Sequence, residues 1–359
     1  KVCMIDQDNQ LWQDIQAQVD NLRHVIQHLY THERQHLLSA AAELQNDRPV
    51  ALVGIGSAAY LNMPAEVYLS KNGRFSATYN ASDGYYSLLP ALKNANVIIN
   101  SRSGETVEVV KLSRSLAEAG VPFVLITNEP ESTAARLAKH VIWCDTRKDL
   151  LVSINIVTSM MVATLVTAAA AIGQLDQLNT GLGNFLPQFE AAVAWASAQA
   201  EIYYSFFNQA RPLYLLYRGE AKGAAFCGRL VLEEVARWPG VAMEAAEFRQ
   251  GPIEVVDDRF GTVLFVPQGV QGKLNLALAN DLLESGGEVM LVGDCTRDER
   301  PGQLVFPLPG VEDIFLPVAG VVPMQTLAYK LAYHQGYTPG EVRYISKVIT
   351  TEAGLPKDA

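Results

Sequence analysis

The sequence predicts an α/β protein with two parallel sheets, each sandwiched by helices in three layers. Short, continuous apolar runs alternate with longer segments of helical periodicity, a pattern typical of parallel strands buried on both faces. The alternation occurs twice, at a spacing of about 160 residues, which indicates a duplicated fold. Hydrophobic residues make up 49% of the 359 residues and charged ones 18%, so the chain has enough apolar side chains for two cores.

Composition also restricts the class of partner. The net charge of −10 argues against nucleic acid or an anionic membrane as the partner. The apolar stretch Ile156–Ile172 contains Thr and Ser, so we expect a buried core helix there and no membrane span. Lys1–Gln10 has no apolar signal segment, and the four cysteines form no disulfide framework. We therefore expect a cytoplasmic protein.

The segment Asp8–Leu44 predicts one or two amphipathic helices, because apolar residues recur there at helical spacing. It also carries four histidines, each four residues from the next: His24, His28, His32 and His36. Two histidines one helical turn apart can share a metal ion, but neither a nearby cysteine nor an H-E-x-x-H pattern supports such a site. The favoured interpretation is a stripe that faces solvent or another subunit, and we expect no metal and no cofactor.

The first half predicts a five-stranded sheet with interspersed helices. Its strands are Val50–Val53, Phe75–Tyr79, Val97–Asn100, Pro122–Thr127 and His140–Cys144. Helices are predicted at Ala58–Leu69, Val107–Ala119, Ser132–Lys139 and Ser153–Ile172. The glycine-containing stretch Gly173–Gly183 is interpreted as a linker, followed by a long helix at Phe185–Phe207.

The second half repeats this scheme. Its strands are predicted at Pro212–Tyr217, Val241–Ala245, Thr262–Val266, Val289–Val292 and Leu304–Phe306. Its helices are predicted at Ala221–Val235, Gly272–Glu284 and Ala319–Gln335. We expect an N-terminal helical segment at 1–48, a first domain at 49–175, a second at 184–336 and a tail at 337–359 that covers the active site.

The stretch from Val97 to Thr106 is the strongest local signal for chemistry. A buried strand ends there in Ser101, Arg102, Ser103, Gly104 and Thr106, and a helix follows. Backbone amides at a helix start, with hydroxyl donors beside them, favour an anion such as phosphate. The alternative is an ordinary strand-to-helix turn with a serine N-cap. The turn at Gly56-Ser57 also follows a strand, so we expect both segments at the same edge of the sheet, where they can face one pocket.

Carboxylates on the helix Ala221–Val235 are a second candidate. Glu233 and Glu234 are adjacent and point about 100° apart on a helix, so at most one of them faces a site. A solvated helix face is the alternative to a catalytic role.

Taken together, these motifs resemble the tandem sugar isomerase (SIS) domain family. The resemblance is to the isomerase half of glutamine–fructose-6-phosphate amidotransferase and to related fructosamine-phosphate deglycases and amino-sugar-phosphate deaminases. Ser101–Thr106 resembles the family's S-x-S-G-E-T phosphate loop, and Gly54–Ser57 resembles its G-x-G-[ST] turn. Arg218 to Glu234 resembles the R-G…K-E helix, and Lys347–Thr350 resembles the terminal K-S-V-T. The resemblance spans roughly Pro49 to Glu352.

The resemblance assigns roles to individual residues. It implies that a sugar phosphate is held by Ser57, Ser101, Arg102, Ser103, Thr106 and Ser153. Glu234 would move a proton between C1 and C2 of the sugar, and Lys347 would stabilise charge on the sugar oxygens. It also implies a homodimer in which a neighbouring subunit contributes to each site.

Gln250 is the main departure from the family pattern. It stands sixteen residues after Glu234, where the family has the ring-opening histidine of an H-G-P loop. Glutamine can hydrogen-bond a ring oxygen but cannot exchange a proton near neutral pH. Val231 and Glu233 also stand where lysines are common in the family.

Two hypotheses follow. The first is an enzyme acting on an amino-sugar phosphate or fructosamine phosphate, of isomerase, deaminase or deglycase type. The alternative is a SIS protein that senses a phosphosugar with little or no turnover. Retention of Glu234 and Lys347 favours the enzyme. The sequence shows no glutaminase domain, so we expect no glutaminase activity.

Overall fold

The computed structural model describes residues 6, 8–150, 152–295, 300–346 and 348–352. The chain forms two compact units, each with its own sheet. The first-sheet unit comprises Asp20–Asn184 and Val342–Ala359, and the second-sheet unit comprises Lys1–Val19 and Phe185–Glu341. The domain boundaries expected from the sequence stay a prediction.

Two of the three unit boundaries fall within long helices, α1 (Gln10–Thr31) and α10 (Leu175–Phe207), and the third lies between Glu341 and Val342. The predicted linker at Gly173–Gly183 is wrong, because most of it is the beginning of α10. Leu175, Leu178 and Leu182 recur at helical spacing and are buried. Their burial outweighs the cost of about 1 kcal/mol that each glycine adds to a helix.

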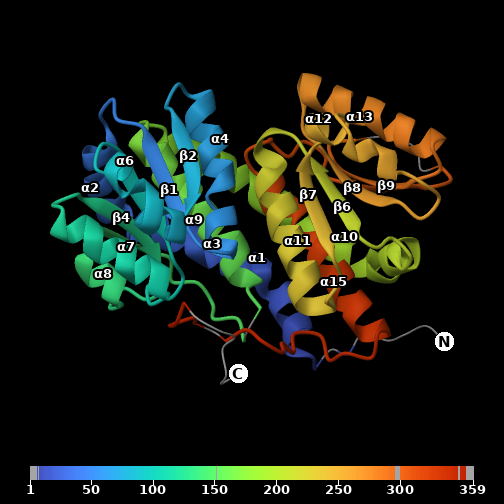
Figure 1. Cartoon of the computed structure of the whole chain (residues 1–359), viewed down its shortest axis with the longest axis horizontal. Helices are drawn as coiled ribbons and strands as arrows, with labels where there is room; N and C mark the ends of the chain where they lie inside the picture. The colour runs from blue at the N-terminus through green and yellow to red at the C-terminus, as the bar shows by residue number, and fades with distance from the viewer. Residues whose placement is uncertain (1–5, 7, 151, 296–299, 347, 353–359) are drawn as a thin grey trace. The chain divides into compact units, whose positions relative to one another are not determined.

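The first sheet is five-stranded and entirely parallel, in the order β2-β1-β3-β4-β5 (Figure 1). Its strands are β1 (Val50–Gly54), β2 (Ser76–Asn80), β3 (Asn96–Asn100), β4 (Phe123–Thr127) and β5 (His140–Trp143). Every residue of β1, β3 and β4 is buried, as continuous apolar runs predict for strands covered on both faces.

Helices cover both faces of this sheet. On one side, α2 (Arg34–Leu44) and α4 (Met63–Lys71) contact the fully buried α9 (Asn155–Ala171). On the opposite side of the sheet, a hydrophobic core includes Val97 and Ile99 of β3 and Leu112 of α7 (Val107–Glu118). The remaining elements are α3 (Ser57–Tyr60), α5 (Ala81–Asp83), the π-helical turn η1 (Gly84–Leu88), α6 (Leu89–Leu92) and α8 (Thr133–Leu137).

One predicted helix, Ala58–Leu69, is divided into α3 and α4. Pro64 lies in the first turn of α4, where its missing amide N–H and fixed φ suit the start of a new helix.

The second sheet has the order β10-β9-β8-β6-β7, all parallel, so the first strand of each sheet lies between the second and the third. Its strands are β6 (Leu213–Tyr217), β7 (Gly240–Glu244), β8 (Gly261–Val266), β9 (Glu288–Gly293) and β10 (Gln303–Pro307). The helical elements are η2 (Gly219–Ala221), α11 (Lys222–Ala236), α12 (Ala245–Phe248), η3 (Pro252–Val255), α13 (Gly269–Glu284), α14 (Leu316–Gly320) and α15 (Val322–His334). The shared strand order confirms the predicted pair of α/β subdomains.

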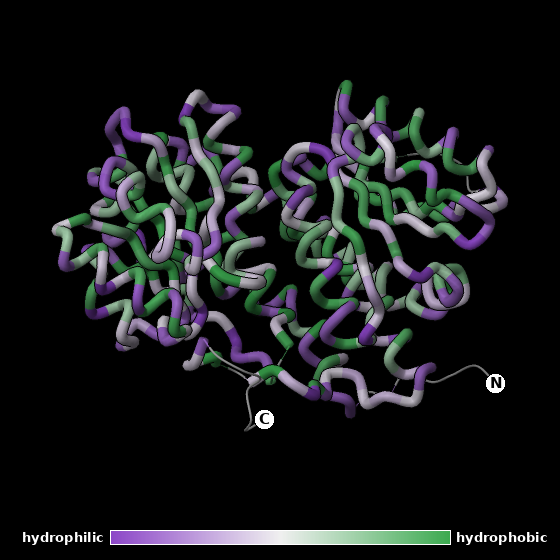
Figure 2. The backbone as a smooth tube through the Cα atoms, viewed as in Figure 1, coloured by the Kyte–Doolittle hydropathy of each residue, from purple (hydrophilic) through white to green (hydrophobic). Residues whose placement is uncertain are grey.

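The strands of both sheets are predominantly apolar in Figure 2. Among the helices of the described residues, none is long and apolar enough to cross a membrane. Residues 337–346 and 348–352 form neither helix nor strand.

Candidate functional site

The loop between β3 and α7 is shaped by its own hydroxyl groups. The Ser101 hydroxyl oxygen accepts the Gly104 N–H at 3.1 Å, and that of Ser103 accepts the Glu105 N–H at 3.2 Å. Gly104 has a φ of +61°, which allows the chain to turn back toward the start of α7. A hydroxyl whose oxygen accepts an amide still has its own proton to donate, so both serines can donate to an anion.

This loop is tied to the connection between β4 and α8. The Arg102 carbonyl accepts the Thr127 hydroxyl at 3.1 Å and the Asn128 N–H at 3.0 Å. The Gly104 carbonyl accepts the Ala134 N–H at 3.1 Å. A carboxylate oxygen of Glu105 accepts the Thr133 N–H at 2.5 Å. The loop is thus held in one conformation before any ligand arrives, which lowers the entropic cost of binding.

A pocket of about 380 Å³ opens beside the loop. The loop contributes Arg102, Ser103 and Glu105 to its lining. The other lining residues come from the β4–α8 connection, from Lys148, from the start of α9 and from the C-terminal segment: Asn128, Glu129, Glu131, Ser132, Lys148, Ile156 and Val348. The volume suits a small polar metabolite.

The charges around the pocket are mixed. Two cations, Arg102 and Lys148, face three carboxylates in its lining, and Lys148 pairs with Glu129 at 2.7 Å. Burial lowers the pKa of the Arg102 guanidinium, while the carboxylates of Asp149 and Glu129 oppose that shift. Arginine stays charged in proteins, so Arg102 supplies a partly desolvated positive charge at the pocket.

Asp149 fixes the start of α9. Its carboxylate accepts the backbone N–H groups of Ile154, Asn155 and Ile156 at 2.8–3.0 Å. Burial raises the pKa of Asp149, and these hydrogen bonds oppose the rise. Ser153 lies half-buried in the turn that this carboxylate organises.

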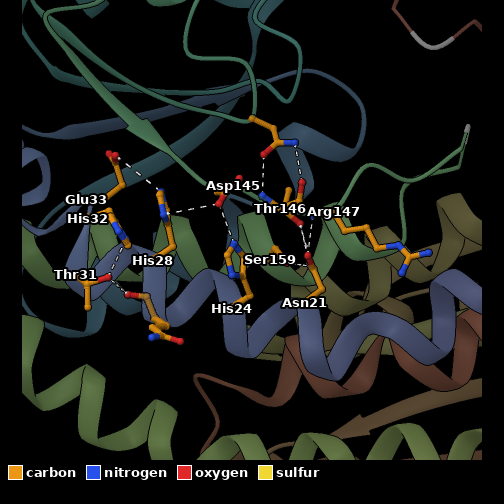
Figure 3. A network of polar contacts seen from close by, with 12 residues as sticks. Asn21, His24, His28, Thr31, His32, Glu33, Asp145, Thr146, Arg147 and Ser159 are labelled. Carbon is orange, nitrogen blue, oxygen red and sulfur yellow. Dashed lines mark hydrogen bonds and ion pairs between the residues drawn. The ribbon is translucent and has the colours of Figure 1, made fainter.

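The segment after β5 is held in place from α1 (Figure 3). The Asn21 side-chain oxygen accepts the Arg147 N–H at 2.7 Å, and its amide donates to the Thr146 hydroxyl at 2.9 Å. Thr146 in turn exchanges two hydrogen bonds with the pocket residue Asn128, at 2.8 and 2.9 Å. This network connects the loop that carries Lys148 to the pocket wall.

The predicted histidine stripe lies beside the same segment, at the end of β5. His24 Nε2 is 2.8 Å from an Asp145 oxygen (Figure 3). The buried His28 packs edge-on against Trp143. The prediction of a stripe that faces solvent or another subunit is wrong at His28, which is buried, whereas His24, His32 and His36 are exposed. No group of three or more His, Cys, Asp or Glu side chains suited to a metal occurs in the described part of the chain.

Ser57 begins α3 directly after β1, and β1 lies beside β3 in the sheet. Ser57 and Ser101 are therefore at the same edge, as expected from the sequence. Of the predicted phosphate ligands, Arg102 and Ser103 line the pocket, whereas Ser57, Ser101, Thr106 and Ser153 are not among its lining residues.

The carboxylate candidate Glu234 belongs to the second-sheet unit, near the end of α11. Burial, and to a smaller extent the neighbouring carboxylate of Glu233, raises the pKa of Glu234 to about 7. Glu233 lies 3.8 Å from Arg229 one turn earlier. The two adjacent glutamates thus have different environments. A carboxyl group that titrates near neutral pH suits proton transfer.

Gln250 and Lys347 are two further candidates from the sequence. Gln250 is exposed in the turn between α12 and η3. Lys347 lies outside the described residues. Arg218, from the predicted R-G motif, bonds Asn275 at 2.7 Å and Glu244 at 3.0 Å, which joins α13 to the ends of β6 and β7.

The pocket residues Asn128, Glu129 and Lys148 were not predicted. They belong to no motif, but Asn128 directly follows the predicted strand Pro122–Thr127. The rule that ligands bind at the carboxyl ends of parallel strands would have found Asn128.

Comparison with known proteins agrees with this architecture. Residues 43–172 match the family model of the SIS domain. The glutamine–fructose-6-phosphate aminotransferase (isomerizing) of Gluconobacter oxydans is 27% identical over 316 residues, which are 84% of this chain and 52% of that protein. The chain thus spans about half the length of the curated relatives it matches.

Solved structures show the same fold. The C-terminal domain of glucosamine-fructose-6-phosphate aminotransferase from Francisella tularensis superposes with a TM-score of 0.81 at 20% identity, covering 92% of this chain and 97% of that one. Tagatose-6-phosphate ketose/aldose isomerase from Escherichia coli superposes with a TM-score of 0.79 at 17% identity, covering 94% and 96%. Residues 43–172 thus match a SIS domain, and most of the chain is similar to part of the glutamine–fructose-6-phosphate aminotransferases.

Proposed function

We propose that the protein is an enzyme that acts on an amino-sugar phosphate or a fructosamine phosphate. The observation that carries the proposal is the preorganised Ser101–Thr106 loop, whose Ser103 and partly buried Arg102 line a pocket of about 380 Å³. A phosphate dianion in this pocket would accept a hydrogen bond from the Ser103 hydroxyl. The homology to glutamine–fructose-6-phosphate aminotransferase supports a phosphosugar as the substrate class.

The proposed chemistry is proton transfer between C1 and C2. Glu234 takes a proton from the carbon next to the carbonyl or imine and returns it to the neighbouring carbon. Its pKa of about 7 lets it act as base and then as acid near neutral pH. Lys347 stabilises the negative charge that develops on the sugar oxygen, as a cation does in such transition states. Isomerase, deaminase and deglycase reactions all share this step.

A panel of phosphorylated amino sugars and of fructose 6-phosphate–amino acid conjugates tests the proposal. Released amine, released ammonia and isomerised sugar are measured for the wild type and for Glu234→Gln. We expect the wild type to turn over at least one member and the variant to be strongly impaired. Tight binding without turnover of any member would instead support the alternative, a phosphosugar-sensing protein.

Gln250 gives a prediction about ring opening. Gln250→His introduces a group that exchanges protons near neutral pH, so we expect faster turnover of closed-ring sugar phosphates by about 10-fold or more. Gln250→Asn is the matched control, because it keeps the amide chemistry. An equal effect of both variants, or no gain with histidine on closed-ring substrates, would contradict a ring-opening role.

We also propose that the active form is a homodimer. Gln250 is exposed in a turn, so it is accessible to a second subunit, as the resemblance implies. Sedimentation velocity of the purified protein should give twice the chain mass of 39.2 kDa. A monomer that retains full activity on the panel would refute this arrangement.

A further inference from the structure

The C-terminal segment makes a backbone contact with the helix that follows the phosphate loop. The carbonyl of Ile349 accepts the N–H of Val107, the first residue of α7, at 3.1 Å. Thr106, the N-cap residue of α7, makes no side-chain capping bond. A carbonyl from far along the chain therefore takes one of the amides that a helix start leaves without an internal partner.

Three side chains fasten this segment, and we name them the tail clamp: Tyr86, Lys111 and Glu352. One carboxylate oxygen of Glu352 accepts the Tyr86 hydroxyl at 2.8 Å and pairs with the Lys111 ammonium. The Lys111 ammonium also lies 5.6 and 5.9 Å from the ring centres of Tyr85 and Tyr86. Glu352 thus joins the end of the described chain to α7 and to the π-helical turn η1.

The segment that the clamp fastens is also part of the pocket. Val348, the neighbour of Ile349, lines the pocket together with Ser103 and Glu105. The Ser346 hydroxyl donates to the Val348 carbonyl at 2.8 Å, a further contact within this segment. The Val107–Ile349 hydrogen bond therefore connects the C-terminal segment, which forms one wall of the pocket, to the residue directly after the Ser101–Thr106 loop, which forms another wall.

We propose that Glu352 is a positioning residue for phosphosugar binding: through the tail clamp it holds Val348 in the pocket wall beside the phosphate loop. The inference rests on the proposed function for the identity of the ligand. Glu352 itself touches no substrate in this account. It raises the fraction of molecules whose pocket is complete, and apparent affinity scales with that fraction.

Glu352→Ala is the test, with glucosamine 6-phosphate and fructose 6-phosphate as probes in calorimetric titrations. We expect roughly three- to fivefold weaker binding, because the lost contacts are a partly exposed ion pair and one hydrogen bond. Glu43→Ala is the matched control, since it removes the Glu43–Lys139 pair, which is similarly exposed and lies outside the pocket lining. The double charge exchange Lys111→Glu with Glu352→Lys should restore affinity, which a general loss of stability would not allow.

Amide hydrogen exchange at Val107 supplies a readout that needs no ligand. Glu352→Ala should speed exchange there and Glu43→Ala should not. Unchanged exchange at Val107 would overturn the clamp, and faster exchange with unchanged affinity would overturn its positioning role. If the wild type binds neither sugar phosphate, the proposed function fails together with the positioning role, even where exchange shows that the tail contact exists.

Discussion

Glu234→Gln is expected to lower kcat by about 10²–10⁴-fold, the range typical for loss of a general base. Glutamine has nearly the same size and shape as glutamate but cannot accept a proton near neutral pH. The phosphate loop lies on a separate element of the chain, so KM should change by much less than kcat. Steady-state kinetics on the best substrate of the panel measures both constants.

The pH dependence adds a second signature. Because the pKa of Glu234 is raised to about 7, the wild-type rate should fall as the pH drops through 7, where the base becomes protonated. The stability of the fold should change with pH in the opposite direction to the rate. Raising the folded-state pKa of a carboxyl group above its unfolded value makes folding less favourable as pH rises from about 4.5 to 7. Glu234→Gln removes this cost, so at pH 8 its free energy of unfolding should be about 1–2 kcal/mol higher than that of the wild type. This range allows for the partial exposure of the side chain.

Glu233→Gln is the control for both measurements. It is the adjacent glutamate on the same helix and lies near Arg229. We expect its kcat to stay within a few-fold of the wild type. Equal losses of kcat in the two variants would show that the negative charge of this helix matters and that Glu234 is not the base.

Gly104→Ala is expected to destabilise the protein by about 2–5 kcal/mol and to abolish measurable sugar-phosphate binding. A Cβ at this position would lie 2.0 Å from the Ser132 hydroxyl oxygen and 2.6 Å from the Ser132 Cβ. Ser132 is the N-cap of α8, so it cannot move away without disturbing that helix start. The φ of +61° adds the strain of a left-handed backbone. Thermal unfolding and calorimetric titration measure the two effects.

Gly120→Ala separates the effect of backbone strain from the effect of a steric clash. Gly120 follows α7 and has a φ of +67°, and a Cβ added there would meet no described atom within 4 Å. Its replacement should cost only the backbone term, about 1–2 kcal/mol, and leave ligand binding intact. If the two alanine variants lose equal stability and both still bind sugar phosphates, the close packing of Gly104 against Ser132 has no role in the site.

The sheets could be predicted from sequence because their signals are local. All ten predicted strands agree with observed ones to within about two residues at each end, since short continuous runs such as Val97-Ile98-Ile99, bounded by turn residues, favour a strand buried on both faces. The start of α10 could not be predicted in the same way. Its glycines are visible in the sequence, whereas the burial of Leu178 and Leu182 depends on the tertiary structure.

Part of the candidate site could likewise be predicted from the sequence, and part could not. The serines of the Ser101–Thr106 loop follow from a contiguous motif, and the backbone N–H groups that their hydroxyl oxygens accept belong to the same motif. Asn128 and Lys148 reach the pocket from other strand ends through sheet topology, which no short motif encodes. The raised pKa of Glu234 likewise depends on burial by residues distant in sequence. The Glu352 contacts with Tyr86 and Lys111 join residues far apart in the sequence, so they depend on the tertiary structure.

We propose that the Ser101–Thr106 loop binds the phosphate of a sugar phosphate. Calorimetric titration of the wild type with fructose 6-phosphate and with unphosphorylated fructose tests it most directly. We expect the phosphorylated sugar to bind at least about 100-fold more tightly, because the loop hydroxyls and Arg102 interact with the phosphate dianion. Equal affinity for the two sugars, or no binding of the phosphorylated one, would contradict the assignment.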